Sequence, residues 1–252
     1  YLSNDQKLSD KLFAQYGVRF SYFNNLGGSL MAYGDTLAGV EKPLLSVTEK
    51  GDWESIASYQ NVEPRASLRY QLSESSSLKA SYNRMSQYIH QISNTTASTP
   101  IDIWQPSDNN IAPQMGNQVA MGYFRNIGGK RFETSAEVYY KWNKNQVDYI
   151  DGAELFINEF IASQLLSGVG RAYGLELYVK KNAGRLTGWV SYTLGKSELK
   201  VDGIKYGDDR KNREGNWYAT RFDQRHNLKV AGFYDLTERV SLSANFSFMS
   251  GT

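Results

Sequence analysis

Apolar and polar residues alternate along most of this chain. In the stretch RFETSAEVYYKW, residues 131–142, one parity is mainly apolar and the other mainly polar. The apolar parity holds Phe132, Thr134, Ala136, Val138, Tyr140 and Trp142, and the other holds Glu133, Ser135, Glu137, Tyr139 and Lys141. A period of two residues is that of a β-strand with two unlike faces. The same pattern predicts strands over 11–23, 62–72, 77–89, 118–126, 131–147, 171–181, 185–197, 221–236 and 239–249, with the end of an earlier strand at 1–8.

The connections between these strands alternate between short and long. The short ones are 8–10, 73–76, 127–130, 181–184 and 236–239, and the long ones are 24–60, 92–116, 148–170 and 198–219. Soluble domains seldom contain several structureless loops of more than about 15 residues. Membrane barrels have short periplasmic turns on one rim and long extracellular loops on the other. The pattern therefore favours an antiparallel transmembrane β-barrel over a soluble sandwich with all its long loops at one end.

The amino-acid composition argues against several classes of function and structure. The chain of 252 residues has a formal charge of +2 and no cysteine, which disfavours nucleic-acid binding and excludes disulfides and thiolate sites. No stretch has the roughly 18 uninterrupted apolar residues of a membrane helix, and the N-terminus has no apolar signal-peptide core. Barrel strands need only about ten alternating residues, so this polar composition agrees with a barrel.

The two parities have the composition expected of a lipid face and a wet lumen. Aromatic residues such as Tyr140 and Trp142 lie near strand ends on the apolar parity, where an interfacial girdle would lie. The polar parity carries both signs of charge, as a hydrated lumen tolerates. It holds Glu63, Arg65, Arg69, Glu133, Glu137, Lys141, Glu176, Lys180, Arg221, Asp223, Arg225 and Lys229.

Three short motifs in this order resemble the barrel of a TonB-dependent outer-membrane receptor, and the likeness covers roughly residues 62 to 250. They are GxAYGLE at 170–176, GWxSYTL at 188–194, and Trp217 followed by Asp223, Arg225 and His226. The resemblance implies a 22-stranded barrel in a Gram-negative outer membrane, plugged by an N-terminal domain. Such receptors import a scarce ligand with energy delivered through a TonB box. Residues 1–252 are then expected to be a barrel segment of about ten strands, with the plug and TonB box outside this sequence.

The resemblance also implies partners: outer-membrane lipid, the TonB–ExbB–ExbD complex acting through the plug region, a surface lipoprotein over the mouth, and a small-molecule, glycan or peptide ligand. Aromatic residues in three long loops are candidates to stack on that ligand or to hold the loops together. The candidate ligand-binding residues are Trp53, Trp104, Trp217, Tyr218, Arg65, Arg69, Glu133, Glu137, Arg221 and Arg225.

A catalytic site and a metal site have weaker support in the sequence. His90 lies near Ser86 and Ser93, as an outer-membrane hydrolase would need, but no nucleophile-elbow motif accompanies it, so no enzymatic activity is expected. No metal or cofactor site is expected, because the loop acids Asp151, Glu154, Asp208 and Asp209 lack EF-hand spacing. The apolar run at 153–166 indicates either a short helix folded over the mouth or an added pair of strand extensions, and a loop lid is favoured over a partner-binding helix. A passive porin or adhesin-like barrel remains the alternative function, and a hydrolase is a third.

Overall fold

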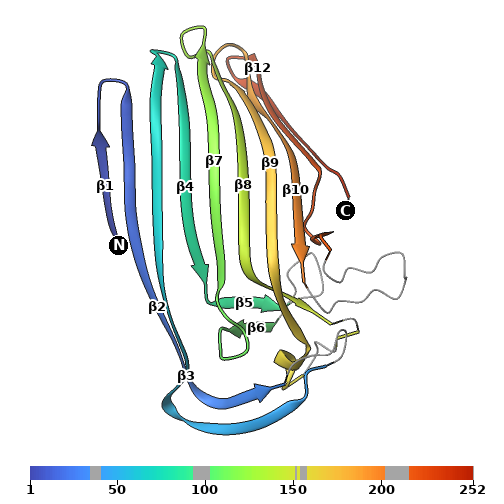
Figure 1. The fold of residues 1–252 in the computed structure, drawn as a ribbon. Coiled ribbons are helices and arrows are strands. Elements are labelled where there is room, and N and C mark those ends of the chain that lie inside the picture. The colour runs from blue at the N-terminus through green and yellow to red at the C-terminus, as the bar shows by residue number, and fades with distance from the viewer. Residues whose placement is uncertain (35–40, 93–102, 151, 154–157, 202–215, 252) are drawn as a thin grey trace.

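The computed structural model describes residues 1–34, 41–92, 103–150, 152–153, 158–201 and 216–251. Its main feature is one antiparallel sheet whose strands follow chain order (Figure 1). In sheet order these are β1 Leu2–Lys7, β2 Leu12–Tyr33, β3 Leu44–Ser73, β4 Ser76–Gln87, β7 Gln114–Ile127, β8 Phe132–Tyr149, β9 Leu165–Lys181, β10 Leu186–Lys200, β12 His226–Thr237 and β13 Val240–Met249. The predicted all-β antiparallel class is confirmed.

Three short strands lie outside that order. β11, Tyr218–Ala219, pairs with β10, and β5, Ile89–Ile92, pairs with β6, Ile103–Pro106, in a separate two-stranded sheet. The only helix among the described residues is η1, Ile161–Gln164, which is a single 3₁₀ turn. Within the same ranges, no helix has the length and apolarity needed to cross a bilayer.

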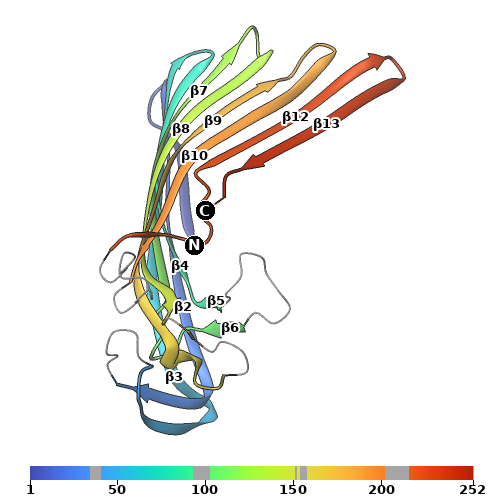
Figure 2. The same cartoon turned by 90° about the vertical axis from the view of Figure 1, so that its right-hand side faces the viewer.

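The short and long connections lie on opposite rims of the sheet, as predicted. In Figure 1 all the tight hairpin turns lie at the upper rim, and the long connections that enclose β5, β6 and η1 lie at the lower rim. Figure 2 shows that the sheet is strongly curved, with β5 and β6 on its concave side. The sheet is open, with β1 and β13 at its two edges.

The connection predicted over 24–60 is mostly strand. β2 continues to Tyr33 and β3 starts at Leu44, so an extended hairpin projects beyond the rest of the long-loop rim (Figure 1). The register shifts between Leu26 and Gly28, and residues 51–54 bulge out of the pairing. Gly27 and Gly28 have φ of 72° and 84° there, which other residues rarely adopt. The prediction failed here because residues 24–33 and 44–60 have no strict apolar parity, and only the backbone pairing shows that they form strands.

Two further boundaries differ from the prediction. Of the two structures expected for 153–166, the described C-terminal part contains a short 3₁₀ turn, η1, and Leu165 then starts β9 as a strand extension. The apolar side chains of this run pack into a loop cluster, so their spacing reflects burial and not helical periodicity. The strand predicted over 221–236 starts at His226, since Arg221 and Arg225 belong to the preceding loop. Residues 154–157 lie outside the described ranges.

The register gives the sheet two distinct faces, because residues paired across strands share a face. We call the concave side the inner face, because Tyr88 beside β5 stacks on Phe23 there, with ring centroids 5.1 Å apart. The other side is the outer face. On β8 and its neighbours the outer face carries Phe132, Thr134, Ala136, Val138, Tyr140, Trp142, Val119, Met121, Tyr123, Tyr173, Leu175, Leu177 and Val179. The inner face carries Glu133, Ser135, Glu137, Tyr139, Lys141, Glu176, Tyr178 and Lys180.

Buried apolar clusters occur only at the long-loop rim among the described residues. One contains Ile92, Ile111, Ile161, Ala162 and Leu165, and brings two long connections together, with Tyr33 at the end of β2 packed against it. A second contains Ile150, Leu166, Val201 and Tyr218. The middle of the sheet has no such core, and its large apolar side chains are exposed on the outer face. That arrangement fits a wall whose apolar surface is covered by lipid.

Candidate ligand-binding interior

The inner face of β3 and β4 is basic. The guanidinium of Arg69 lies 4.3 Å from the ring centroid of Phe13, that of Arg65 lies 4.9 Å from Tyr1, and the Lys79 amine lies 4.2 Å from Phe124. Each cation therefore rests on an aromatic face and keeps its charge available to the lumen. None of the three has a carboxylate within 4.0 Å among the described residues. We call Arg65, Arg69 and Lys79 the basic section.

Glu63 on the same strand is a structural acid. Its side chain is 2% exposed, accepts a 2.7 Å hydrogen bond from the Ser21 hydroxyl and lies 3.8 Å from the Arg19 guanidinium. A carboxylate held in this way stabilises the β2–β3 wall and does not reach a ligand.

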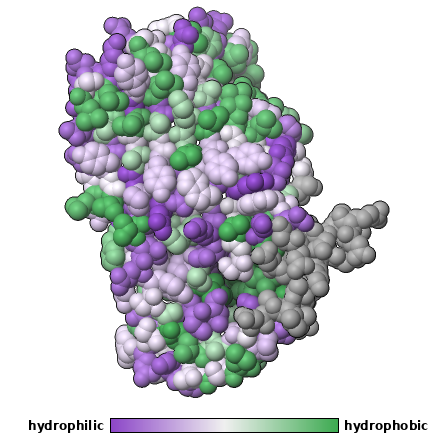
Figure 3. Space-filling model, in the orientation of Figure 1, coloured by the Kyte–Doolittle hydropathy of each residue, from purple (hydrophilic) through white to green (hydrophobic). Residues whose placement is uncertain are grey.

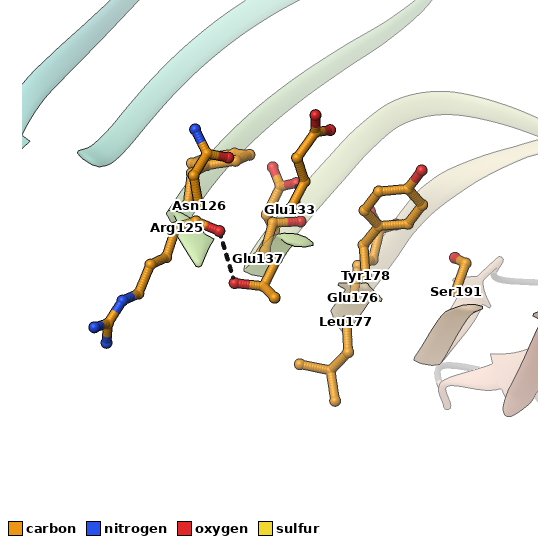
Figure 4. Close-up of a pocket in the computed structure, with 11 residues that line it drawn as sticks. Arg125, Asn126, Glu133, Glu137, Glu176, Leu177, Tyr178 and Ser191 are labelled. Carbon is orange, nitrogen blue, oxygen red and sulfur yellow. Dashed lines mark hydrogen bonds between the residues drawn. The ribbon is translucent and has the colours of Figure 1, made fainter. Parts of the chain in front are cut away.

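The inner face of β8 and β9 carries an acidic hollow of about 430 Å³. Glu133, Glu137 and Glu176 line it together with Tyr178 and Ser191. Figure 4 shows Glu133, Tyr178 and Ser191 on one side of the sheet and Arg125 and Leu177 on the other. The register places Glu137 directly opposite Glu176, and like charges in that position repel each other. No cation lies within 4.0 Å of either carboxylate among the described residues, so the hollow favours a positively charged occupant.

The connection between β4 and β7 folds onto the inner face at the mouth. The Tyr88 hydroxyl lies 2.6 Å from Ser21 Oγ and accepts a 2.9 Å hydrogen bond from the Asn61 amide. Tyr59 donates to the carbonyl of Asp108 at 2.5 Å, and Asn25 donates to that of Ser107 at 3.2 Å. Polar side chains of β2 and β3 thus hold the β5–β6 hairpin inside the mouth.

His90 is part of this docked hairpin and has a structural role. Its side chain is 1% exposed, and Nε2 lies 2.9 Å from the hydroxyl of Ser107, which is fully buried. Burial lowers the pKa of His90, and the nearby Asp108 carboxylate opposes that shift. The histidine therefore meets Ser107 and not Ser86, and the pair is closed to substrate. Ser93 lies outside the described residues, as do the four loop acids weighed for calcium.

The β2–β3 hairpin also reaches across the mouth. Lys42 donates a 2.7 Å hydrogen bond to the carbonyl of Leu165, and Ser163 donates one of 2.5 Å to Glu41. Tyr33 packs against the buried cluster that contains Ile161. Burial lowers the pKa of Lys42. These contacts tie the loops before β3, β7 and β9 into one cap.

The predicted aromatic residues do not gather at one point. Trp53 is 87% exposed on the bulge of β3, and Trp104 is exposed on β6. Trp217 stacks on the Arg171 guanidinium at 4.1 Å, on the outer face. Tyr218 is buried and donates a 2.5 Å hydrogen bond to Asp148. Trp217 precedes β11 and Tyr218 begins it, and the two side chains contact different partners.

The predicted charged residues divide into three places. Arg65 and Arg69 lie in the basic section, and Glu133 and Glu137 lie in the acidic hollow. Arg221 contacts Tyr149, and Arg225 lies 3.8 Å from Asp223 in the loop before β12. The candidate list omitted Lys79, Glu176 and Tyr178. The short turn at 73–76 fixes the register of β4 against β3 and so could have indicated Lys79, whereas the positions of Glu176 and Tyr178 opposite β8 depend on the long connection between β8 and β9.

No cluster of three or more histidine, cysteine, aspartate or glutamate side chains fit to hold a metal occurs in the described part of the chain.

Comparisons with known proteins agree with this geometry. The family model described as "TonB dependent receptor-like, beta-barrel" matches residues 1–251. The ferric-catecholate import receptor Fiu of Escherichia coli K12 has 16% sequence identity and a TM-score of 0.60, over 97% of this chain and 33% of that one. The alcaligin receptor FauA of Bordetella pertussis has 18% identity and a TM-score of 0.58, over 98% and 36%. FpvA of Pseudomonas aeruginosa, bound to heterologous pyoverdines, has 11% identity and a TM-score of 0.54, over 96% and 33%.

At these identities the likeness shows the fold alone. This chain spans about a third of the length of those receptors. A search of the curated proteins found no match.

Proposed function

This chain belongs to the family of TonB-dependent receptor-like β-barrels, and from that premise we propose that the full-length protein is an outer-membrane receptor that imports its ligand with TonB-supplied energy. The family consists of receptors and transporters rather than enzymes. The family match over residues 1–251 carries the proposal. The apolar outer face, the charged inner face and the loop cap at one rim support it.

We further propose that the ligand is an anionic ferric chelate. Three similar solved structures are a ferric-catecholate import receptor, an alcaligin receptor, and FpvA bound to heterologous pyoverdines in an iron complex. In this chain, the basic section supports the same ligand class, because three cations held on aromatic faces attract an anion at low desolvation cost. The exposed Trp53 and Trp104 stay candidates for contact with the ligand at the mouth.

Uptake of a radiolabelled ferric siderophore by cells expressing the full-length protein tests this function. Uptake is expected with an intact TonB system and is expected to be lost without it. Unchanged uptake in cells lacking TonB would favour a passive porin instead.

A charge variant tests the ligand class. Arg65→Gln with Arg69→Gln should weaken binding of an anionic ferric chelate by about tenfold or more, since hydrogen bonds to charged groups contribute about 1.5–3 kcal/mol each. Arg239→Gln, in the turn between β12 and β13, is the matched control and should bind as the wild type does. Equal affinity of the double variant and the control would contradict an anionic ligand at this wall.

The acidic hollow supports a second part of the proposal, contact with a basic side chain of the plug domain. The opposed Glu137 and Glu176 repel each other unless a cation enters between them. Replacing both with glutamine should loosen the plug, measured as faster hydrogen exchange of plug amides in the full-length protein. Unchanged exchange would show that the hollow is merely hydrated.

A further inference from the structure

A histidine is buried in the interface that holds the β5–β6 hairpin against the wall. His90 lies on β5, and its Nε2 is 2.9 Å from the hydroxyl of Ser107, which follows β6 and is fully buried. The Nδ1 of His90 is also buried and has no hydrogen-bond partner among the described residues. An imidazolium carries a proton on both ring nitrogens. Whichever tautomer bonds Ser107, protonation therefore leaves a buried N–H without an acceptor, which is a costly state.

Charged and titratable side chains from several elements surround the hairpin. They are Arg19 and Tyr33 of β2, Glu41 and Lys42 of the connection after it, Tyr59 and Glu63 of β3, and Tyr88 and Asp108 beside β5 and β6. Histidine is the residue type whose ordinary pKa places its change of charge between pH 5 and 8. The Asp108 carboxylate accepts hydrogen bonds from the backbone N–H groups of Asn110, at 2.7 Å, and Ile111, at 2.8 Å. Its charge raises the pKa of His90 by less than burial lowers it.

The hairpin lies beyond the part of the wall that is suited to lipid. Figure 3 shows the convex outer face, with apolar side chains over the upper part, pale aromatic rings across the middle and more hydrophilic side chains below. Tyrosine and tryptophan are enriched at the level of lipid headgroups. Figure 1 places β5 and β6 at the lower, hydrophilic level, and Figure 2 places them on the concave side. Protons of the external medium therefore reach the hairpin whenever it leaves the wall.

The wall side of this interface continues into the basic section. The Tyr88 hydroxyl bonds Ser21 and Asn61, and the Ser21 hydroxyl donates to Glu63. Glu63 lies two residues before Arg65 on the inner face of β3. A docked hairpin therefore occupies the inner wall on the mouth side of Arg65. An anion that approaches the basic section from the long-loop rim must pass the hairpin.

We propose that the β5–β6 hairpin is a gate that acid opens: it stays docked on the inner wall near neutral pH, and protonation of His90 releases it and widens the path to the basic section. The direction follows from linkage. Because burial favours the neutral imidazole, docking is fully stable above the ordinary pKa of about 6.5 and weakens as the pH falls below that value. This inference concerns the regulation of the proposed receptor and rests on that function.

Thiol labelling measures release of the hairpin. Ile92→Cys, as the sole cysteine of the full-length receptor in nanodiscs, places a thiol on β5 where Ile92 is 4% exposed in a buried cluster. Trp104→Cys, exposed on β6, is the reference for the pH dependence of thiol reactivity itself. From pH 7.5 to pH 5, labelling of Ile92→Cys by N-ethylmaleimide, relative to the reference, should rise by about 10- to 30-fold, the upper limit being that of a docked His90 that stays neutral. A rise below about threefold would overturn the proposal.

Three variants in the Ile92→Cys background assign the effect to His90. His90→Gln keeps an amide that can bond Ser107 and does not titrate, so its relative labelling should be equal at the two pH values; a full rise would refute the role of His90. Asp108→Asn should keep the rise, and its loss would assign the switch to Asp108 instead. Ser107→Ala covers the case in which His90→Gln is released at every pH. It keeps the histidine, so it should label faster than the parent at pH 7.5 and faster still at pH 5, and a constant rate would contradict the proposal.

A second cysteine position tests whether release opens the path. Ser67 lies on the inner face of β3, further from the mouth than Glu63, and lines a hollow of about 210 Å³ with Arg65. Labelling of Ser67→Cys by externally added fluorescein maleimide should accelerate in acid in parallel with that of Ile92→Cys. Release without faster labelling of Ser67→Cys would show that the hairpin is no gate. Absence of TonB-dependent uptake together with an intact acid response would count against the proposed function and leave the gate standing.

Discussion

Val138 provides the sharpest test of which face of the sheet is in contact with lipid. It lies on the outer face of β8 between its register partners Met121 and Leu175, and is 52% exposed. Four residues separate it from Trp142 and six from Phe132. At about 3.4 Å per residue and a tilt of about 40°, those intervals correspond to depths of roughly 10 and 16 Å. Together they approximate the apolar band of about 25 Å, so Val138 lies near the middle of the bilayer.

Val138→Arg therefore places a charge at the most costly depth. The expected loss is roughly 2–4 kcal/mol of the free energy of unfolding, against about 0–1 kcal/mol near an interface. At 1.4 kcal/mol per factor of ten, the folded fraction relative to the unfolded falls roughly 30- to 700-fold. Denaturant titration of the receptor in lipid vesicles measures this difference.

The same residue introduced on the inner face is the matched control. Ser135→Arg places a guanidinium beside Glu133 and Glu137 in the hydrated hollow, where a change below about 1 kcal/mol is expected. Brominated lipid adds an independent readout in single-tryptophan variants. It should quench Trp142 on the outer face and spare Trp189, which stacks on Tyr178 on the inner face. Equal destabilisation by the two arginines together with equal quenching of the two tryptophans would refute the assignment of the faces.

Three further predictions concern single side chains. Burial lowers the pKa of His90, so docking of the β5–β6 hairpin is fully stable above the unfolded pKa of about 6.5 and weakens as the pH falls through that value toward the folded pKa. Amide protection factors in residues 89–92 and 103–106 should therefore be smaller at pH 5 than at pH 7.5. Protection factors that stay constant would refute this. Tyr88→Phe should weaken the same docking by about 1–2 kcal/mol, because the Tyr88 hydroxyl forms hydrogen bonds with both Ser21 and Asn61. Hydrogen exchange of the hairpin amides measures this loss. The control Tyr70→Phe, on the outer face, should change the exchange little. Gly188→Ala should impair pairing of β10 with β12, since Gly188 has φ of 146° and its added Cβ would lie 2.2 Å from the Ala231 carbonyl oxygen. Its register partner Gly232 has open space for a Cβ and is the control. Equal yields of folded Gly188→Ala and Gly232→Ala protein would contradict the argument.

The sequence predicts the fold best where lipid imposes a pattern. The apolar parity of residues 132–142 is set by hydrocarbon on one side and water on the other, so alternation alone indicates both the strand and its faces. Beyond the membrane that requirement ends. The β2–β3 extension is built from residues such as Asn24, Gly27 and Gly28 that read as a loop, and only the backbone pairing makes it a strand.

The interior could be predicted only in part. The polar parity indicated Arg65, Arg69, Glu133 and Glu137 as inward-facing, and the register agrees. The sequence does not show which charged residues face each other across strands. The opposition of Glu137 and Glu176, for example, depends on the register of two strands joined by a long connection. The separation of the aromatic loop residues was not accessible for a similar reason, since tertiary contacts such as that of Trp217 with Arg171 decide where each side chain lies.

The order of the strands also limits how the number of strands in such a sheet can change. Every neighbour in the main sheet is the next long strand along the chain, so pairing proceeds by local hairpin closure and not by long crossovers. A duplication or deletion of one hairpin leaves every later turn on its original rim. Gain or loss of a single strand would invert the direction of every strand after it and transfer the cap at Ile161 to the opposite compartment. A change in strand number that keeps the cap on its rim therefore adds or removes two strands at a time.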